Sequence, residues 1–205
     1  MEPKATLHRT GSRRLSSNKV TPLHGYAMVL RIELCDSKPQ IYRTIAVPAN
    51  ITLRKLHVTL LRAMGWEGGH LHEFIINHTH YGEPHPDFFE PDVKNEQRVR
   101  LDKALGGVAT FDYVYDFGDA WWHKIKLLEL AELDGPLKSP WCLDGAYACP
   151  PEDVGGIPGY EEFLEVMADA SHPEHADMKQ WCGGTFDPAH FDLDEVNERL
   201  SEIQL

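Results

Sequence analysis

Apolar and polar residues alternate from Tyr26 onward, and this is the first clear pattern in the chain. One side of the alternation holds four apolar residues, Met28, Leu30, Ile32 and Leu34. After a turn sequence at 36–39, a second alternation places three apolar residues on one side, Ile41, Ile45 and Val47. A period of two residues is typical of a half-buried strand. The two stretches therefore predict an antiparallel hairpin that ends at Pro48.

The apolar spacing changes to three and four residues between positions 52 and 65. Four apolar residues follow this spacing, Leu53, Leu56, Leu60 and Met64. Thr52 precedes them as a suitable N-cap, and Gly65 follows them as a residue type that commonly ends helices. We therefore predict an amphipathic helix that crosses the hairpin, followed by a strand over 70–76. Two strands, a crossing helix and a further strand resemble the start of a β-grasp fold.

Two later stretches, 111–116 and 121–130, again alternate and predict a second pair of strands. Between them, Gly118 and Asp119 predict a two-residue type II′ turn, because glycine readily adopts the positive φ that this turn needs. Residues 78–100 are rich in His, Pro, Asp and Glu without periodicity, and they predict an exposed loop.

Helical patterns dominate the last third of the chain. Four apolar residues share one helical face, Tyr160, Phe163, Leu164 and Met167. The Ser-His-Pro-Glu sequence at 171–174 resembles a capping box, and a last helix is predicted from Asp192. Strands come first and helices last. The predicted fold class is therefore α+β, with a mostly antiparallel sheet, one crossing helix and a helical C-terminal portion.

Composition and charge indicate one domain behind a basic leader. The chain has 205 residues, 42% of them hydrophobic, which is enough for one substantial core. Residues 1–24 lack an apolar period and carry five basic residues against one acidic residue, so we expect a disordered leader of charge +4. Since the whole chain has a net charge of -12, the single domain over 25–205 carries -16. Such a charge disfavours nucleic-acid binding by the folded part.

The absence of long apolar runs indicates a cytoplasmic protein without membrane contact. No run of about 18 apolar residues occurs, and the first residues lack the apolar segment of a secretory signal. In a reducing compartment, the four cysteines are expected to be free thiols or metal ligands rather than disulfides.

Cysteine and histidine residues in the C-terminal half predict a first candidate metal site. The five candidate ligands are Cys142, Cys149, His172, His175 and Cys182. Thiolate and imidazole groups suit zinc, and four of the five would complete a tetrahedral structural site. The alternative is that the cysteines are small buried residues that pack a loop rich in proline and glycine against the helices.

A second candidate site combines histidines and carboxylates from the predicted strands and turn. Its five residues are His70, His72, Asp116, Asp119 and His123. If the strands over 70–76 and 121–130 are neighbours, these groups converge and would bind a divalent metal or act in acid–base catalysis. The alternative is that the histidines form hydrogen bonds at the edge of the core and the aspartates hold the turn.

Several motifs together resemble one known family. They are Tyr115-Asp116-Phe117-Gly118-Asp119-x-Trp-x-His123, Cys142-Leu-Asp-Gly-x-x-Ala-Cys149-Pro-Pro-Glu-Asp-x-Gly-Gly, Gly159-Tyr160-Glu161-Glu162-Phe163, His172-Pro173-Glu174-His175 and Phe186-Asp187-Pro-x-x-Phe-Asp. From Tyr26 to Ile203 the chain resembles the plasmid pRiA4b ORF-3-like family. The resemblance implies a bacterial or archaeal α+β domain without an established activity, and some members are labelled insertion-element passenger or resolvase-like proteins. Many members have a cysteine where this chain has Val154, which disfavours an all-cysteine metal site.

The chemistry of a serine resolvase does not fit this sequence. That reaction needs a nucleophilic serine among arginines and a helix that holds DNA, whereas the folded part is acidic and has no basic recognition helix. We therefore expect a cytoplasmic interaction or accessory module with an unknown protein partner, and the resemblance implies an association with mobile elements. Five aromatic residues near the charged turn favour an interface, Tyr113, Tyr115, Trp121, Trp122 and Trp141. The alternative function is a metal-dependent hydrolase that uses the histidine and aspartate site.

Overall fold

The computed structural model describes residues 7–8, 25–84 and 92–205 of the chain. Its strands are β1 (Leu7–His8), β2 (Tyr26–Leu34), β3 (Tyr42–Pro48), β4 (His72–Ile76), β5 (Thr79–Gly82), β6 (Val93–Asn95), β7 (Thr110–Tyr115), β8 (Trp121–Leu133) and β9 (Trp141–Ala146). Its helices are α1 (Leu53–Met64), α2 (Leu101–Leu105), α3 (Gly156–Ala168), α4 (His175–Trp181) and α5 (Leu193–Ser201). Apart from β1, the predicted leader lies outside the described residues. None of the described helices is long and apolar enough to cross a membrane.

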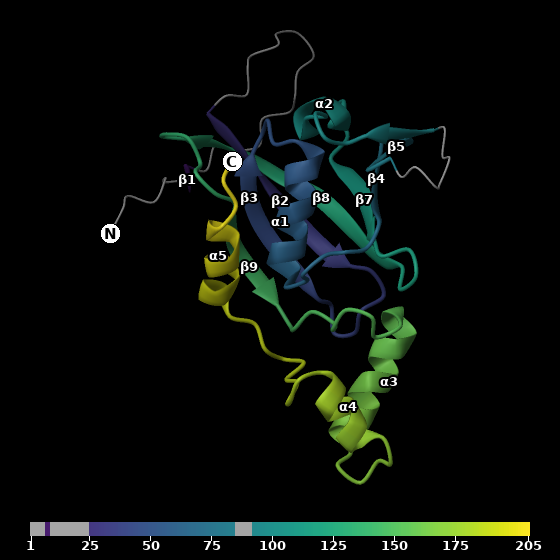
Figure 1. Cartoon of the computed structure of the whole chain (residues 1–205). Helices are drawn as coiled ribbons and strands as arrows, with labels where there is room; N and C mark the ends of the chain where they lie inside the picture. Colours follow the sequence, from purple (N-terminus) through teal and green to yellow (C-terminus); the bar gives the residue numbers. More distant parts are fainter. Residues whose placement is uncertain (1–6, 9–24, 85–91) are drawn as a thin grey trace.

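The strands form one sheet in the order β6-β5-β4-β7-β8-β2-β3-β9, with β1 beside β8 (Figure 1). The described pairings are antiparallel except that of β5 with β6, which confirms the predicted α+β class and mostly antiparallel sheet. The prediction of a loop over 78–100 is wrong at β5 and β6. These strands have four and three residues, and stretches that short do not show a period.

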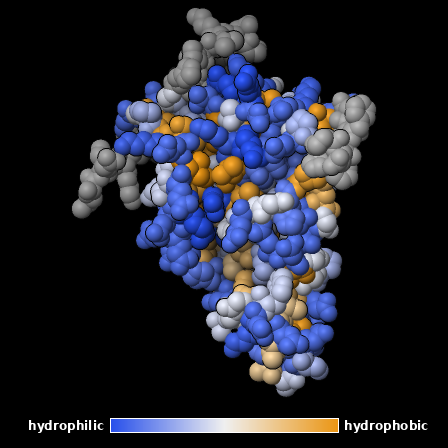
Figure 2. All heavy atoms as spheres, viewed as in Figure 1, coloured by the Kyte–Doolittle hydropathy of each residue, from blue (hydrophilic) through white to orange (hydrophobic). Residues whose placement is uncertain are grey.

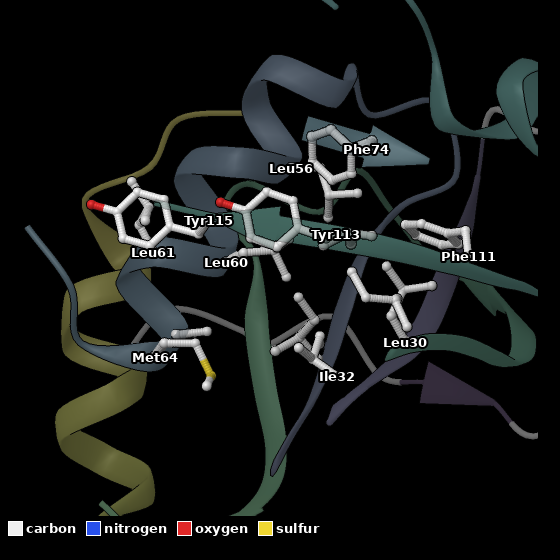
Figure 3. Close-up of a cluster of buried hydrophobic side chains, with 14 of the residues drawn as sticks. Leu30, Ile32, Leu56, Leu60, Leu61, Met64, Phe74, Phe111, Tyr113 and Tyr115 are labelled. Atoms are coloured by element: carbon white, nitrogen blue, oxygen red, sulfur yellow. The ribbon is translucent and has the colours of Figure 1, made fainter. Parts of the chain in front are cut away.

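The first hairpin and the crossing helix form as predicted. β2 pairs with β3, and the alternating apolar side chains of β2 are buried. Thr52 Oγ1 accepts a hydrogen bond from the Lys55 N–H at 3.3 Å, and Gly65 ends α1 with a φ of 102°. In Figure 3, Leu56 and Leu60 of α1 belong to the same apolar cluster as Leu30 of β2. Each such buried side chain contributes about 1.5–3 kcal/mol to folding.

β4, the strand after the helix, does not lie beside the first hairpin. β7 and β8 separate β4 from β2, so the β-grasp-like start continues into a wider sheet. β7 consequently lies between the strand that carries His72 and the strand that carries His123.

The turn between β7 and β8 differs from the predicted type II′ turn. The strands close with Tyr115 opposite Trp121, and the positive φ values of the turn fall on Asp116 and Ala120, both at 54°, rather than on Gly118. Asp116 Oδ1 accepts a hydrogen bond from the Gly118 N–H at 2.9 Å, which is the local bond that lets an aspartate replace glycine in a turn. This conformation leaves the second oxygen of Asp116 free to face another residue.

The C-terminal portion is helical as predicted, with α5 beside α1 and β9 while α3 and α4 extend beyond one end of the sheet (Figure 1). Asp192 caps α5 by accepting hydrogen bonds from the N–H groups of Asp194 and Glu195. The predicted capping box at 171–174 is wrong, because α4 begins at His175 and the Ser171 hydroxyl donates to Asp169 instead.

Candidate functional site

A buried arginine fastens the 147–155 loop, which connects β9 to α3. Arg43 points inward from β3 and is only 3% exposed. Its guanidinium donates hydrogen bonds of 2.7–3.1 Å to four carbonyl oxygens, those of Tyr42, Ala63, Ala146 and Tyr147. These acceptors connect β3, the end of α1, β9 and the loop. The sequence analysis missed Arg43, although a charged residue at an inward strand position is itself a signal of a structural or functional role.

Trp66 and Glu152 hold the other end of the loop. The Trp66 indole N–H donates to the Pro150 carbonyl at 3.0 Å. The Glu152 carboxylate accepts hydrogen bonds from the Tyr115 hydroxyl at 2.6 Å and from the Glu67 N–H at 2.9 Å. Burial and the hydrogen bond to Glu152 both raise the pKa of Tyr115, so this hydroxyl keeps its proton and remains a donor. The loop is therefore attached to β7 and to the segment after α1.

Asp119, one of the predicted site residues, attaches the β7–β8 turn to the loop. Its Oδ2 accepts a hydrogen bond from the Gly155 N–H at 3.1 Å. Gly156 follows with a φ of 69°, and a Cβ at that position would lie 2.4 Å from the Asp119 carbonyl oxygen. Only glycine permits this approach of two backbones. Asp119 thus has a structural role in bringing the turn and the loop together.

Three residues with metal-ligating side chains meet where the turn and the loop touch. His70 Nδ1 lies 3.3 Å from Asp116 Oδ2, and His70 Nε2 lies 3.4 Å from Asp153 Oδ1. Asp116 is buried, His70 is half-buried and Asp153 is exposed. The structure therefore brings together two of the predicted residues, His70 and Asp116. Asp153 was missed, and its place next to Glu152 in the Pro-Pro-Glu-Asp motif was the available signal.

His72 belongs to a separate, buried chain of polar groups. Its ring stacks on His57 at a centroid distance of 3.4 Å, and its Nε2 lies 2.9 Å from Glu96 Oε2. His57 Nδ1 in turn lies 2.8 Å from the Tyr113 hydroxyl. Burial, followed by the neighbouring His72, lowers the pKa of His57 to about 2, so His57 is neutral at pH 7. This chain runs through the core rather than along a cleft.

His123 lies on β8 across Tyr113 from His72 and is 1% exposed. Neither of its ring nitrogens makes a hydrogen bond of acceptable geometry with a described residue. Its ring lies nearly perpendicular to that of Trp66 at a centroid distance of 5.4 Å. Burial lowers its pKa to about 4. The five predicted catalytic candidates are thus distributed over the metal-ligating group, the loop attachment and two core positions.

Replacing His123 with leucine is expected to remove part of the acid sensitivity of the fold. Since its folded pKa of about 4 lies below the value of about 6.5 in the unfolded chain, the unfolded state takes up a proton first as the pH falls. The contribution of His123 to the free energy of unfolding is fully present above about pH 6.5. It decreases by about 1.4 kcal/mol for each pH unit below that, down to about pH 4. Urea unfolding at pH 7 and at pH 4.5 should show that wild type loses about 2.5 kcal/mol of unfolding free energy at the lower pH that His123→Leu retains. A retained free energy no larger than that of the surface variant His80→Gln contradicts the prediction.

The structure does not bring the five predicted zinc ligands together. Cys142 lies in β9, where its thiol donates to the Asp144 carbonyl at 3.4 Å and burial raises its pKa. The Cys182 thiol donates to the Gly184 carbonyl at 3.3 Å, and His175 Nδ1 lies 3.0 Å from the Val166 carbonyl. In residues 7–8, 25–84 and 92–205, one group of at least three potential ligands has its atoms within 4.8 Å of one another, and it is His70, Asp116 and Asp153. Zinc at Cys142, Cys149, His172, His175 and Cys182 stays a prediction.

Two cavities lie beside the loop. The larger, about 470 Å³, is bounded by the end of α1, the loop and α5. Its arginines already donate to backbone carbonyls, Arg43 as described above and Arg199 to the Arg62 carbonyl at 3.1 Å. Two of its carboxylates are also engaged, Glu152 by Tyr115 and Glu195 by His190. This cavity therefore offers few free polar groups to a ligand.

The second cavity, about 440 Å³, is a groove between α3 and α4. We call it the α3–α4 groove, and its lining residues are Asp153, Val154, Gly159, Glu162, Phe163, Glu174, Asp177, Met178 and Trp181. α4 has no buried residue, and Trp181 is 48% exposed. Figure 2 shows apolar colour among hydrophilic residues over the lower end of the molecule, where Figure 1 places α3 and α4. This groove therefore presents apolar side chains to solvent beside the loop.

Comparisons with known proteins found one matching family model, a similar sequence and a similar solved structure. The family model described as "Plasmid pRiA4b ORF-3-like protein" matches residues 26–195. The uncharacterized protein y4hQ of Sinorhizobium fredii is 36% identical over 177 residues, which are 85% of this chain and 90% of that protein. The crystal structure of a protein of unknown function, MM3350 from Methanosarcina mazei Go1, is similar with a TM-score of 0.73 and 34% identity. The match covers 83% of this chain and 97% of that chain.

Proposed function

The chain belongs to the plasmid pRiA4b ORF-3-like family, and we propose that it is an interaction module whose α3–α4 groove binds a basic, amphipathic segment of a partner protein. The observation that supports this proposal is that the groove has an apolar floor and a rim whose charged residues are all negative. The four free cysteines, Cys35, Cys142, Cys149 and Cys182, support a place in a reducing cytoplasm. The plasmid reading frame in the family's description supports an association with mobile elements.

The rim of the groove selects for positive charge. Its carboxylates are Asp153, Glu162, Glu174 and Asp177, and no lysine, arginine or histidine is among the described lining residues. Exposed ion pairs contribute only about 0.2–1 kcal/mol each. Their main effect is to raise the association rate of a basic partner and to reject acidic ones.

The floor of the groove supplies the apolar contact that such a partner needs. Three residues of α4, Asp177, Met178 and Trp181, follow the N-cap residue Glu174 at the spacing i+3, i+4 and i+7, which places all four on one helical face. Phe163 of α3 meets the Trp181 ring at a centroid distance of 6.1 Å. Exposed tryptophan and flexible methionine side chains are typical of surfaces that bind amphipathic helices. The partner segment is therefore expected to be helical, with lysine or arginine beside an apolar stripe.

The arrangement supports binding better than hydrolysis. A hydrolase would need His72, Asp119 and His123 to converge in an open cleft with the metal-ligating group. His72 and His123 are buried in the core instead, and Asp119 is bonded to the loop. The groove, by contrast, is open, and its carboxylates and the exposed Trp181 face solvent.

A helical peptide of leucine and lysine, labelled with a fluorophore, is expected to bind the full chain at least tenfold more tightly than the same peptide with glutamate in place of lysine. Trp181→Ala should weaken binding about tenfold or more, because truncated interface tryptophans commonly cost about 2 kcal/mol. Asp177→Lys should weaken it by reversing a rim charge. Fluorescence anisotropy measures all three effects.

The matched control is Glu165→Lys, which reverses an exposed charge on α3 outside the groove. Equal weakening by Glu165→Lys and Asp177→Lys would mean general attraction to an acidic protein and would overturn the proposal. A synthetic peptide of residues 1–24, which carries a charge of +4, is a second probe. If it binds the groove more tightly than the designed peptide, the chain's own leader is the occupant and the assignment to a partner is wrong.

A further inference from the structure

We infer that His70, Asp116 and Asp153 form a binding site for one divalent transition-metal ion of the zinc or manganese type. This site goes beyond the proposed interaction function; it shares Asp153 with the rim of the α3–α4 groove but does not need a bound peptide. The three residues precede β4, follow β7 and lie in the 147–155 loop, respectively. Their potential ligand atoms lie within 4.8 Å of one another.

The two contacts of the His70 ring are too long for strong charge-assisted hydrogen bonds. The two contacts of the His70 ring with carboxylate oxygens are 3.3 and 3.4 Å long. Charge-assisted hydrogen bonds are shorter, at about 2.7–2.9 Å. Two ligand atoms that each lie about 2.1 Å from one ion are roughly 3.0–3.4 Å apart at octahedral or tetrahedral angles. The contact of His70 Nδ1 with Asp116 Oδ2 has this spacing. Asp153 faces the other ring nitrogen, Nε2, and its exposed side chain would turn toward an ion bound at Nδ1 to complete the shell, since one ligand atom of each residue lies within 4.8 Å of the others.

The chemistry of the three side chains indicates the class of metal. One imidazole with two carboxylates is a mixed nitrogen and oxygen set, which suits Zn²⁺ and Mn²⁺ better than the all-oxygen preference of Mg²⁺ and Ca²⁺. Three protein ligands leave at least one position for water or a ligand. The Asp153 side chain is 69% exposed, so an ion reaches the site directly from solvent.

Two of the ligands are held in place by groups other than the metal. Asp116 uses Oδ1 to close its own turn, which directs Oδ2 toward His70. The His70 ring meets Tyr115 edge-on at a centroid distance of 5.8 Å. The loop that carries Asp153 is already attached through Glu152 and through the bond from Gly155 to Asp119. The Asp153 carboxylate is thus not needed to attach the loop and remains available as a ligand.

The test is isothermal titration of the chelator-treated full chain with Zn²⁺ and with Mn²⁺. We expect one ion per chain, and at least tenfold weaker binding by Asp153→Asn and by His70→Gln. Asp153→Asn changes an exposed group, so its folding should match wild type. A matched control is His80→Gln, because His80 also pairs with a carboxylate, Glu73 Oε1 at 2.9 Å, without a third ligand.

Two further outcomes separate this site from other metal sites. Bound metal should raise the melting temperature of wild type and leave that of Asp153→Asn unchanged, since an ion that binds only the folded state stabilises it. Binding that Asp153→Asn leaves unchanged, or that His80→Gln weakens equally, overturns the inference. Loss of Zn²⁺ in Cys182→Ser but not in Asp153→Asn would assign the metal to the cysteine and histidine residues instead. None of these results depends on peptide binding by the α3–α4 groove.

Discussion

Arg43→Ala is expected to destabilise the protein by about 3–5 kcal/mol, in the range of losses that follow removal of one partner of a buried charged group. The substitution leaves four carbonyl oxygens without their donor and opens a cavity where the side chain lay. Burial lowers the pKa of Arg43, yet an arginine stays charged at neutral pH. The four carbonyl oxygens therefore stabilise a positive charge in the core. Without these hydrogen bonds, α1, β9 and the 147–155 loop lose the side chain that connects them.

Urea unfolding at pH 7 measures this loss, with Arg31→Ala as the control. Arg31 lies on the same hairpin, but its partner Glu33 is partly exposed and the pair is worth at most about 1 kcal/mol. Arg43→Lys should fall between wild type and alanine, because one ammonium cannot reach the acceptors that a planar guanidinium reaches. A loss in Arg43→Ala no larger than that in Arg31→Ala would show that the four hydrogen bonds do not hold the loop.

The second large effect is expected from Gly156→Ala, with a loss of about 2–4 kcal/mol from strain at a positive φ combined with a steric clash. Alanine would need a φ of 69° and would place its Cβ 2.4 Å from the Asp119 carbonyl oxygen. The contact joins a Cβ, whose position is fixed by the backbone, to a backbone oxygen, so no side-chain rotation relieves it. The β7–β8 turn and the loop must move apart, which also separates Asp116 from Asp153.

Gly135→Ala is the control, because no atom lies within 4 Å of its added Cβ and its φ is outside the left-handed region. Its stability should stay within about 0.5 kcal/mol of wild type. Thermal unfolding compares the two variants, and hydrogen exchange of the Gly155 amide reports whether the bond to Asp119 has opened. Equal stability of both variants, with Gly155 still protected, would refute the prediction.

The elements that the sequence predicted best are those whose structure depends on residues close to one another in the sequence. The hairpin of β2 and β3 was predicted from alternation, and α1 from its apolar spacing and from Thr52 and Gly65 at its ends. The turn after β7 was placed correctly, but its conformation was not. Its positive φ values fall on Asp116 and Ala120, because a side-chain bond from Asp116 stabilises the turn without a left-handed glycine.

The candidate site was predicted only in part. His70 and Asp116 were recognised as residue types suited to metal or acid–base chemistry, and they do meet. His72 and His123 were expected to join them, but the insertion of β7 between β4 and β8 places Tyr113 between their rings. Arg43 and Asp153 were missed, because an alternation pattern describes what is buried and not what a buried or exposed polar group contacts.

The sequence by itself determined the α+β class, the main hairpin, the crossing helix and the family, because period, capping residues and motifs act or are recognised over a few positions. Only the tertiary structure decided which polar side chains share a site. That depends on strand order and on loop attachment between residues such as His70 and Asp153, which lie far apart along the chain. Local patterns do not encode such contacts, since each is the combined result of packing across the whole sheet.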